Sequence, residues 1–247
     1  METLGEDLVL LAMTHEGKVG VADKLRFGVA GSELVRLAAA QRVDVVDGRI
    51  VVLSRSRTGD ARLDAALADI ERSKRPPKAG AWVARDRPGL VESYLEQLVS
   101  QGVVRAERRK RFGIFTVTRW FVIDSGRVAQ ARDRLDAVAR SSGPIDSSQA
   151  ALGGLAHAIE LDVLLYPLHE GPANESARER LEQIAEADPA AATVRSTAEQ
   201  AAVDASIDAA MAASVNAAVS ASVYATHHAA VQHGGHDGGA GAVGGHH

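Results

Sequence analysis

Apolar residues recur at helical spacing along most of the chain, which predicts a mainly α-helical protein. Thr58-Gly59-Asp60 is a start signal before one of these segments, and Gly102 follows another at the position where many helices end. The expected helices fall near residues 8–12, 34–38, 60–70, 90–101, 128–138, 152–159 and 181–184.

Two segments have strand character instead. Val43–Val46 and Arg49–Leu53 flank Asp47-Gly48, a two-residue loop suited to a type I′ turn. The segment from Val103 to Val122 predicts a second and longer hairpin. The expected fold class is therefore mainly α, a helical-bundle core decorated with β-hairpins in a single domain.

The remaining segments set the domain limits. Ser73–Gly80 contains Pro76-Pro77 and predicts an exposed connector. Apolar residues between Val203 and Val223 recur every four positions. Because an α-helix has about 3.6 residues per turn, these residues do not stay on one face, and we expect such a helix to pack only along its first half. From Gly234 onward the Gly/His composition predicts disorder. We expect one domain over residues 1–210, then an Ala-rich helix end and a disordered tail over 211–247.

Composition excludes several classes of protein. The chain has 247 residues and no cysteine, which excludes disulfide scaffolds and thiolate chemistry and favours a reducing compartment. No apolar run reaches the roughly 20 residues that span a bilayer, and acidic residues follow Met1 where a secretory signal would be basic. We expect a cytoplasmic protein. Its many arginines and alanines are typical of a GC-rich bacterial genome.

Charge is unevenly distributed along the chain. The formal net charge is −4, yet Arg72–Arg111 holds eleven Lys/Arg against four Asp/Glu, a local balance of +7. A basic stretch on an otherwise acidic protein favours an anionic partner. The alternative is that charged helix ends and loops happen to cluster there.

The longer hairpin combines four cations with bulky apolar residues. Arg108, Arg109, Lys110 and Arg111 run directly into Phe112-Gly113-Ile114-Phe115. On a membrane, this order would place the cations at the level of the lipid head groups. The side chains of Phe112, Ile114 and Phe115 would then lie deeper in the bilayer. In the alternative, the aromatic rings pack on the helical body. The residues alone leave both interpretations open.

Other chemistries have weaker support. The helix before this hairpin could be the reading helix of a winged-helix DNA binder, but it carries Glu92 and Glu96 and no cation.

Most histidines lie in the last 21 residues, without a framework for a metal site, and His15, His157 and His169 lack ligand spacing. No phosphate loop, zinc helix or nucleophile elbow is present. We expect no enzyme, no metal and no cofactor.

Several short motifs follow one another in a constant order along the chain. They are Glu6–Ala12, Glu16-Gly17, Glu33–Ala38, Thr58-Gly59-Asp60, Leu63–Leu67, Trp82-Val83, Leu98–Val104, Phe112–Phe115, Leu155–Ala158 and Ala187-Asp188-Pro189. Each motif alone is modest, but their order resembles the Golgi-phosphoprotein-3 family, in a bacterial form of actinobacterial type. The resemblance covers roughly residues 4–210.

This resemblance implies a fold and a function. Members are mostly helical, with a four-helix core surrounded by further helices and β-hairpins. Eukaryotic members are cytosolic adaptors that bind phosphatidylinositol 4-phosphate at Golgi membranes and retain glycosyltransferases. By analogy, this chain would be a non-enzymatic peripheral protein on the inner face of the membrane, with anionic phospholipid, membrane-protein clients and further copies of itself as partners.

The head-group residues of the family are not retained in this sequence. The positions that resemble its tryptophan and three of its arginines hold Val21, Ala30, Pro88 and Val91. Four cations close to them in sequence could replace them as a looser anion site. They are Lys24, Arg26, Arg85 and Arg87.

Three functions from different classes remain. The first is docking on anionic membrane through the hairpin and a basic surface. The second is a protein–protein adaptor whose hairpin mediates homo-oligomerisation. The third is winged-helix-like DNA binding.

Overall fold

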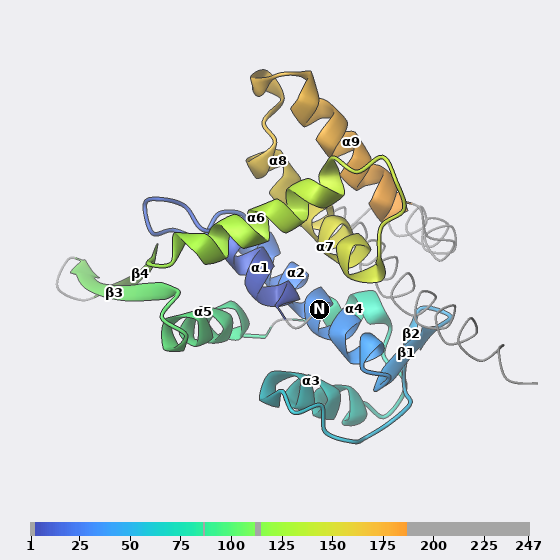
Figure 1. Cartoon of the computed structure of the whole chain (residues 1–247). Coiled ribbons are helices and arrows are strands. Elements are labelled where there is room, and N and C mark those ends of the chain that lie inside the picture. Colours follow the sequence, from blue (N-terminus) through green and yellow to red (C-terminus); the bar gives the residue numbers. More distant parts are fainter. Residues whose placement is uncertain (1–2, 86, 112–114, 187–247) are drawn as a thin grey trace, which may run out of the picture.

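The computed structural model describes residues 3–85, 87–111 and 115–186, and Figure 1 shows their arrangement. The helices are α1 (Leu4–Leu11), α2 (Ala22–Ala39), α3 (Ala61–Glu71), α4 (Ala79–Val83), α5 (Leu90–Ser100), α6 (Ser125–Ala139), α7 (Ser147–Ala158), α8 (Leu161–Leu165), the 3-10 helix η1 (Leu168–Glu170) and α9 (Pro172–Glu186). The strands are β1 (Val43–Val46), β2 (Arg49–Val52), β3 (Val104–Arg111) and β4 (Phe115–Val122). The predicted mainly α class with two β-hairpins is confirmed.

The first helix lies at the centre of the bundle. Every residue from Leu4 to Leu11 is buried, and α1 packs against α2, α5, α6 and α7. A helix surrounded in this way needs apolar residues on most of its circumference, which its sequence provides. The largest side chains of the surrounding core are Leu25, Leu34, Leu37, Trp82, Tyr94, Leu98, Leu135, Leu155 and Tyr166.

Two buried acidic residues of α1 hold the neighbouring helices in place. Asp7 accepts hydrogen bonds from the Arg134 guanidinium at 3.0 and 2.6 Å. Glu6 accepts from the Gln97 amide at 3.0 Å and from Arg127 at 3.3 Å. Because a buried carboxylate without partners is costly, these contacts fix α5 and α6 against α1. They also fix the hairpin β3–β4, since it joins those two helices.

The short hairpin β1–β2 is part of the core. Asp47 and Gly48 have φ values of 48° and 69°, as a type I′ turn requires. Val43 and Ile50 are buried, and the Ile50 amide donates to the carbonyl of Pro77 at 2.9 Å. The predicted turn and strands are confirmed.

The predicted connector ends earlier than expected. Lys74 and Arg75 are exposed, but Ala79 and Gly80 are buried at the start of α4. The cause is Trp82, which is fully buried and donates its indole N–H to Asp69 at 2.9 Å. A helix this short has no periodic stripe, so the pattern did not predict it.

The C-terminal half holds further short helices that the pattern also missed, namely α8 and η1. The helix expected around residues 181–184 begins earlier, at Pro172, where the fixed φ of proline suits the first helical position. The expected stripe from Val203 to Val223, the domain limit at residue 210 and the tail from Gly234 lie outside the described residues.

Candidate functional site

The longer hairpin has the strand pairing that the sequence predicts. Strands β3 and β4 pair antiparallel from Val104 opposite Val122 to Arg111 opposite Phe115. Several of the predicted contact residues lie outside the described part of the chain, or are described only in their backbone. They are Arg109, Arg111, Phe112, Ile114 and Phe115.

The base of this hairpin is fixed to the body. The Trp120 amide donates to the carbonyl of Gly17 at 3.0 Å, which joins β4 to the loop after α1. The Ile123 amide donates to the carbonyl of Val103 at 2.8 Å, which closes the hairpin at its own base. Gly17 has a φ of +74°, and a Cβ at this position would lie 2.9 Å from the ring of Phe121. Glycine is therefore required for this close approach between the loop after α1 and β4.

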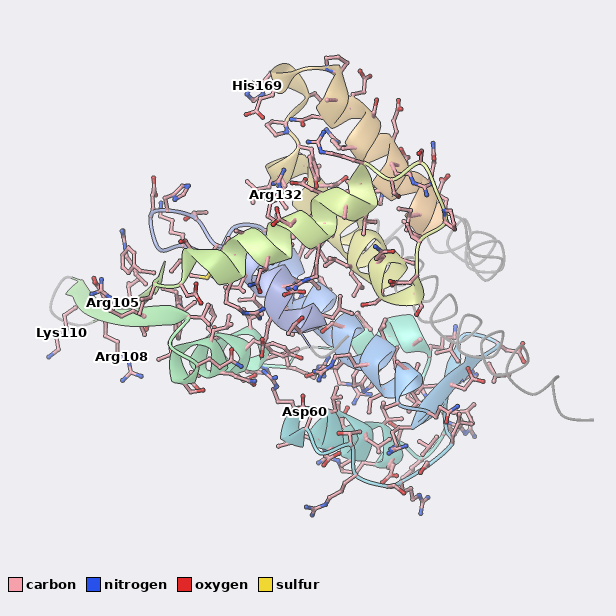
Figure 2. All side chains as sticks on the ribbon, in the orientation of Figure 1. Asp60, Arg105, Arg108, Lys110, Arg132 and His169 are labelled. Carbon is pink, nitrogen blue, oxygen red and sulfur yellow. The ribbon has the colours of Figure 1, made fainter. Side chains whose placement is uncertain are left out.

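Beyond its base, the hairpin projects from the helical body (Figure 1). Arg108 and Lys110 are exposed, and Val117 on the opposite strand is 43% exposed. Being two positions apart in a strand, Arg108 and Lys110 lie on the same side of it (Figure 2). Arg105, closer to the base, forms an ion pair with Glu107 at 2.7 Å.

The fold divides the basic stretch of the sequence. The connector at Ser73–Gly80 lies beside β1–β2, because the backbones of Lys78 and Arg49 form an isolated antiparallel β-bridge. The last cations of the basic stretch lie on β3, and the two hairpins are at opposite sides of the molecule (Figure 1). The local balance of +7 therefore does not form one continuous surface.

Lys24 and Arg26 lie in the first turns of α2. Lys24 forms an ion pair with Glu160, a half-exposed residue before α8, at 2.5 Å. The guanidinium of Arg26 lies 4.3 Å from the ring centroid of Phe27.

Arg85 and Arg87 lie between α4 and α5. Arg85 donates to Asp69 at 2.9 Å, and Arg87 donates to Glu33 at 2.7 Å. Glu33 is almost completely buried, and this burial raises its pKa although the charge of Arg87 acts in the opposite direction. Lys24, Arg85 and Arg87 are thus in ion pairs.

The structure also brings together residues that the sequence did not single out. Arg62 on α3 and Arg72, the C-cap of that helix, line a pocket with Arg87. The one signal in the sequence is the helical spacing of these two arginines with Asp69, which places all three residues on one face of α3 and its C-terminal end. Nothing in the sequence places that face against the segment before α5.

The surface of α5 is unfavourable for a DNA-reading helix. Glu92 and Glu96 are both exposed, so the outer face of this helix is acidic and would be repelled by phosphates.

Within residues 3–85, 87–111 and 115–186, the structure holds neither a cluster of metal ligands nor a single membrane-spanning helix. No group of three or more His, Asp or Glu residues there could hold a metal ion. No single helix in those ranges is long and apolar enough to cross a membrane. Ser147–Ala158 and Leu161–Glu170 together have the length and apolar composition of a span, but the two segments are bent by 87° where they join.

Together, these features define a class: single-domain, mainly helical proteins from which one basic β-hairpin projects. The sequence matches the family model of Golgi phosphoprotein 3 (GPP34) over residues 4–201. The chain therefore belongs to this family. No curated protein matches it in sequence.

Proposed function

We propose that this protein is a non-enzymatic peripheral protein that docks on anionic phospholipid membranes through β3–β4. The observation that supports this most is the projection of a hairpin (Figure 1) whose exposed cations, Arg108 and Lys110, are followed in the sequence by the apolar segment 112–115. Membership of the Golgi phosphoprotein 3 family is consistent with a lipid-binding or adaptor role.

The energies fit reversible attachment. Each cation near an anionic leaflet contributes about 1 kcal/mol, and each inserted large apolar side chain about 1.5–3 kcal/mol. A cytoplasmic protein would meet the inner face of the membrane, which carries the anionic lipid.

The head group is part of the same proposal. By analogy with the family it is phosphatidylinositol 4-phosphate or a related anion, and Lys24, Arg26, Arg85 and Arg87 are the residues that would bind it. Lys24, Arg85 and Arg87 would have to exchange their present carboxylate partners for the lipid phosphate.

The proposal is tested by flotation with vesicles of phosphatidylcholine, with and without phosphatidylserine. The double variant Arg108→Gln/Lys110→Gln should bind the anionic vesicles about 2 kcal/mol more weakly, which is about thirtyfold. The matched control is Lys74→Gln/Arg75→Gln, which removes two exposed cations from the connector at the far side of the molecule. The control should bind like the unchanged protein.

Salt gives an independent check. Raising ionic strength from 0.1 to 1 M shortens the Debye length from about 10 Å to about 3 Å and should release the protein. Equal binding to purely zwitterionic vesicles, insensitive to salt, would contradict the electrostatic part of the proposal. If the protein binds none of the vesicles but elutes as an oligomer in size-exclusion chromatography, the adaptor function is supported instead.

A further inference from the structure

One cluster of ionisable side chains joins three elements of the C-terminal half. His157 lies in the last turn of α7, Asp162 on α8 and Arg178 on α9. These three helices pack against one another, and α8 and α9 lie away from the projecting hairpin β3–β4 (Figure 1). The cluster is therefore placed to fix the packing of this end of the molecule.

Asp162 is the buried centre of the cluster. Its side chain is 2% exposed, and Nδ1 of His157 donates to its Oδ2 at 3.0 Å. Nε of Arg178 is more distant, 3.9 Å from the same oxygen. The other oxygen of Asp162, Oδ1, is buried and has no hydrogen-bond partner in the part of the chain that the structure describes. Because a buried carboxylate needs a close counter-charge, Asp162 depends mainly on His157.

The surroundings of His157 favour its protonated form. The hydrogen bond to Asp162 is the largest cause, and it raises the pKa of His157 above the usual 6.5. Partial burial acts in the opposite direction, while the charges of Asp162 and Glu182 act with the hydrogen bond and that of Arg178 acts against it. The C-terminal end of α7 also favours a cation, because the helix dipole is negative there.

Charged residues on α1, α2 and α6, the other helices that pack against α7, form pairs in which His157 takes no part. These pairs are Glu6 with Arg127, Asp7 with Arg134, Lys24 with Glu160, Glu33 with Arg87, Arg36 with Asp60 and Arg132 with Asp136. The charged groups that act on His157 are Asp162 on α8 and Arg178 and Glu182 on α9.

Helix α8 has few other contacts that hold it. It is five residues long, and two of them, Val163 and Leu164, are about half exposed. Its N-cap, Glu160, has a φ of 58°, which is strained for a residue other than glycine. Just after α8, the hydroxyl of Tyr166 donates to Asp136 on α6 at 2.6 Å and anchors the far end. The near end depends on the cluster.

We propose that His157 and Asp162 form a pH-sensitive clasp, which fixes α8 to α7 and α9 in acidic solution and weakens as the pH rises. While His157 is protonated, its charge balances the buried carboxylate of Asp162. Once His157 has lost the proton, the nearest charge left to Asp162 is the more distant Arg178. The clasp does not depend on membrane docking, because none of its residues lies on β3–β4 or among the four predicted head-group cations.

The direction of the pH effect follows from linkage. A group whose pKa is higher in the folded than in the unfolded chain stabilises the fold fully below its unfolded pKa. This stabilisation is lost as the pH rises through the folded pKa. The contribution of His157 is therefore complete in acidic solution, below 6.5, and declines above it.

The first test compares thermal midpoints of the full chain and of His157→Gln from about pH 5 to about pH 9, at constant ionic strength. At the acidic end the variant should melt about 2–4 °C lower, the shift for one such interaction in a chain of this size. The difference should shrink as the pH rises. The matched control is His169→Gln, which removes an exposed imidazole from η1 and should leave the midpoint unchanged at each pH. A difference that stays constant over the range would overturn the proposal.

The second test needs no loss of the histidine. The imidazole signal of His157 is followed by NMR in the full chain, assigned through the backbone, and should titrate above 6.5. Glu182→Gln should lower this titration midpoint and Arg178→Gln should raise it, as their charges require. The matched control is Glu179→Gln, an exposed residue of the same helix. A midpoint at or below 6.5, or equal shifts in Glu182→Gln and Glu179→Gln, would contradict the clasp.

The conformational part is measured by hydrogen exchange of α8. After correction for the intrinsic exchange rate, the protection of residues 161–165 should fall from about pH 5 to about pH 9 in the unchanged protein. In His157→Gln the protection should be low at both ends of this range. Constant protection in the unchanged protein, or an equal fall in the variant, would show that His157 does not control α8.

Discussion

The hairpins β1–β2 and β3–β4 share one topology but differ in their relation to the helical body. In β1–β2 the strands are short, Val43 and Ile50 are buried, and the Ile50 amide is bonded to the connector. In β3–β4 the strands are twice as long, and the hydrogen bonds described from them to the body reach the loop after α1, at Glu16 and Gly17.

This difference separates two roles for the same secondary structure. The free energy of folding depends on β1–β2, because its side chains fill the core. In the outer half of β3–β4, the described side chains of Arg108, Lys110 and Val117 are exposed and lie outside the core. The predictions below test this separation.

The largest effect is expected at the tip of β3–β4. Replacing Phe112 and Phe115 with serine should remove about 3–6 kcal/mol of membrane affinity if both rings insert. The free energy of unfolding should change by less than about 1 kcal/mol, as at exposed sites. Flotation and thermal unfolding are measured on the same double variant.

Each other outcome of that experiment has a definite meaning. Easy unfolding would show that the rings belong to the core. A stable variant that still floats but changes its elution volume would show that the tip is an oligomer contact.

Alanine substitutions should distinguish the two hairpins by stability. Ile50→Ala in β2 should lower the free energy of unfolding by about 2–5 kcal/mol, because Ile50 is 1% exposed and its loss leaves a cavity. Val117→Ala in β4, where the side chain is 43% exposed, should change it by about 0.5 kcal/mol or less. Urea unfolding gives the free energy of unfolding of both variants. Similar decreases in Ile50→Ala and Val117→Ala would contradict the difference in core packing between the two hairpins.

A smaller effect is expected where β3–β4 meets the body. Gly17 and Gly59 have φ values of +74° and +87°, so alanine is strained at either position by about 1–2 kcal/mol. Only at Gly17 would the new Cβ also meet a ring, that of Phe121 at 2.9 Å. Gly17→Ala should therefore lower the unfolding free energy by about 1–3 kcal/mol more than Gly59→Ala. Equal losses would mean that the base of the hairpin is not fixed at Gly17.

Much of the fold could be predicted because its signals are local. Helical periodicity marked α3, α5, α6 and α7, but only residues 34–38 of α2 and 181–184 of α9. Asp47-Gly48 with its flanking strands marked the type I′ turn of β1–β2. Helices α4 and α8 gave no such signal, since five residues do not make a stripe. Their positions follow from tertiary burial, as with Trp82 against Asp69.

The candidate site could be predicted only in part, for the same reason. The strands β3 and β4 and their cations are continuous in sequence, so the local pattern was sufficient to predict this hairpin. The carboxylates that pair with Lys24 and Arg87 are Glu160 and Glu33, which are distant along the chain. The pocket of Arg62, Arg72 and Arg87 likewise requires the packing of α3 against the start of α5, which no local pattern encodes.

The most direct test of membrane docking compares the two hairpin ends with one probe. The chain has no cysteine, so single variants Gly113→Cys at the tip of β3–β4 and Val46→Cys beside the turn of β1–β2 can each carry an environment-sensitive fluorophore. Val46 is 49% exposed and therefore accessible to labelling. With phosphatidylserine-containing vesicles, the label at residue 113 should shift to the blue and gain intensity, while the label at residue 46 should not change. An unchanged signal at residue 113, or an equal response at both positions, would contradict docking through β3–β4.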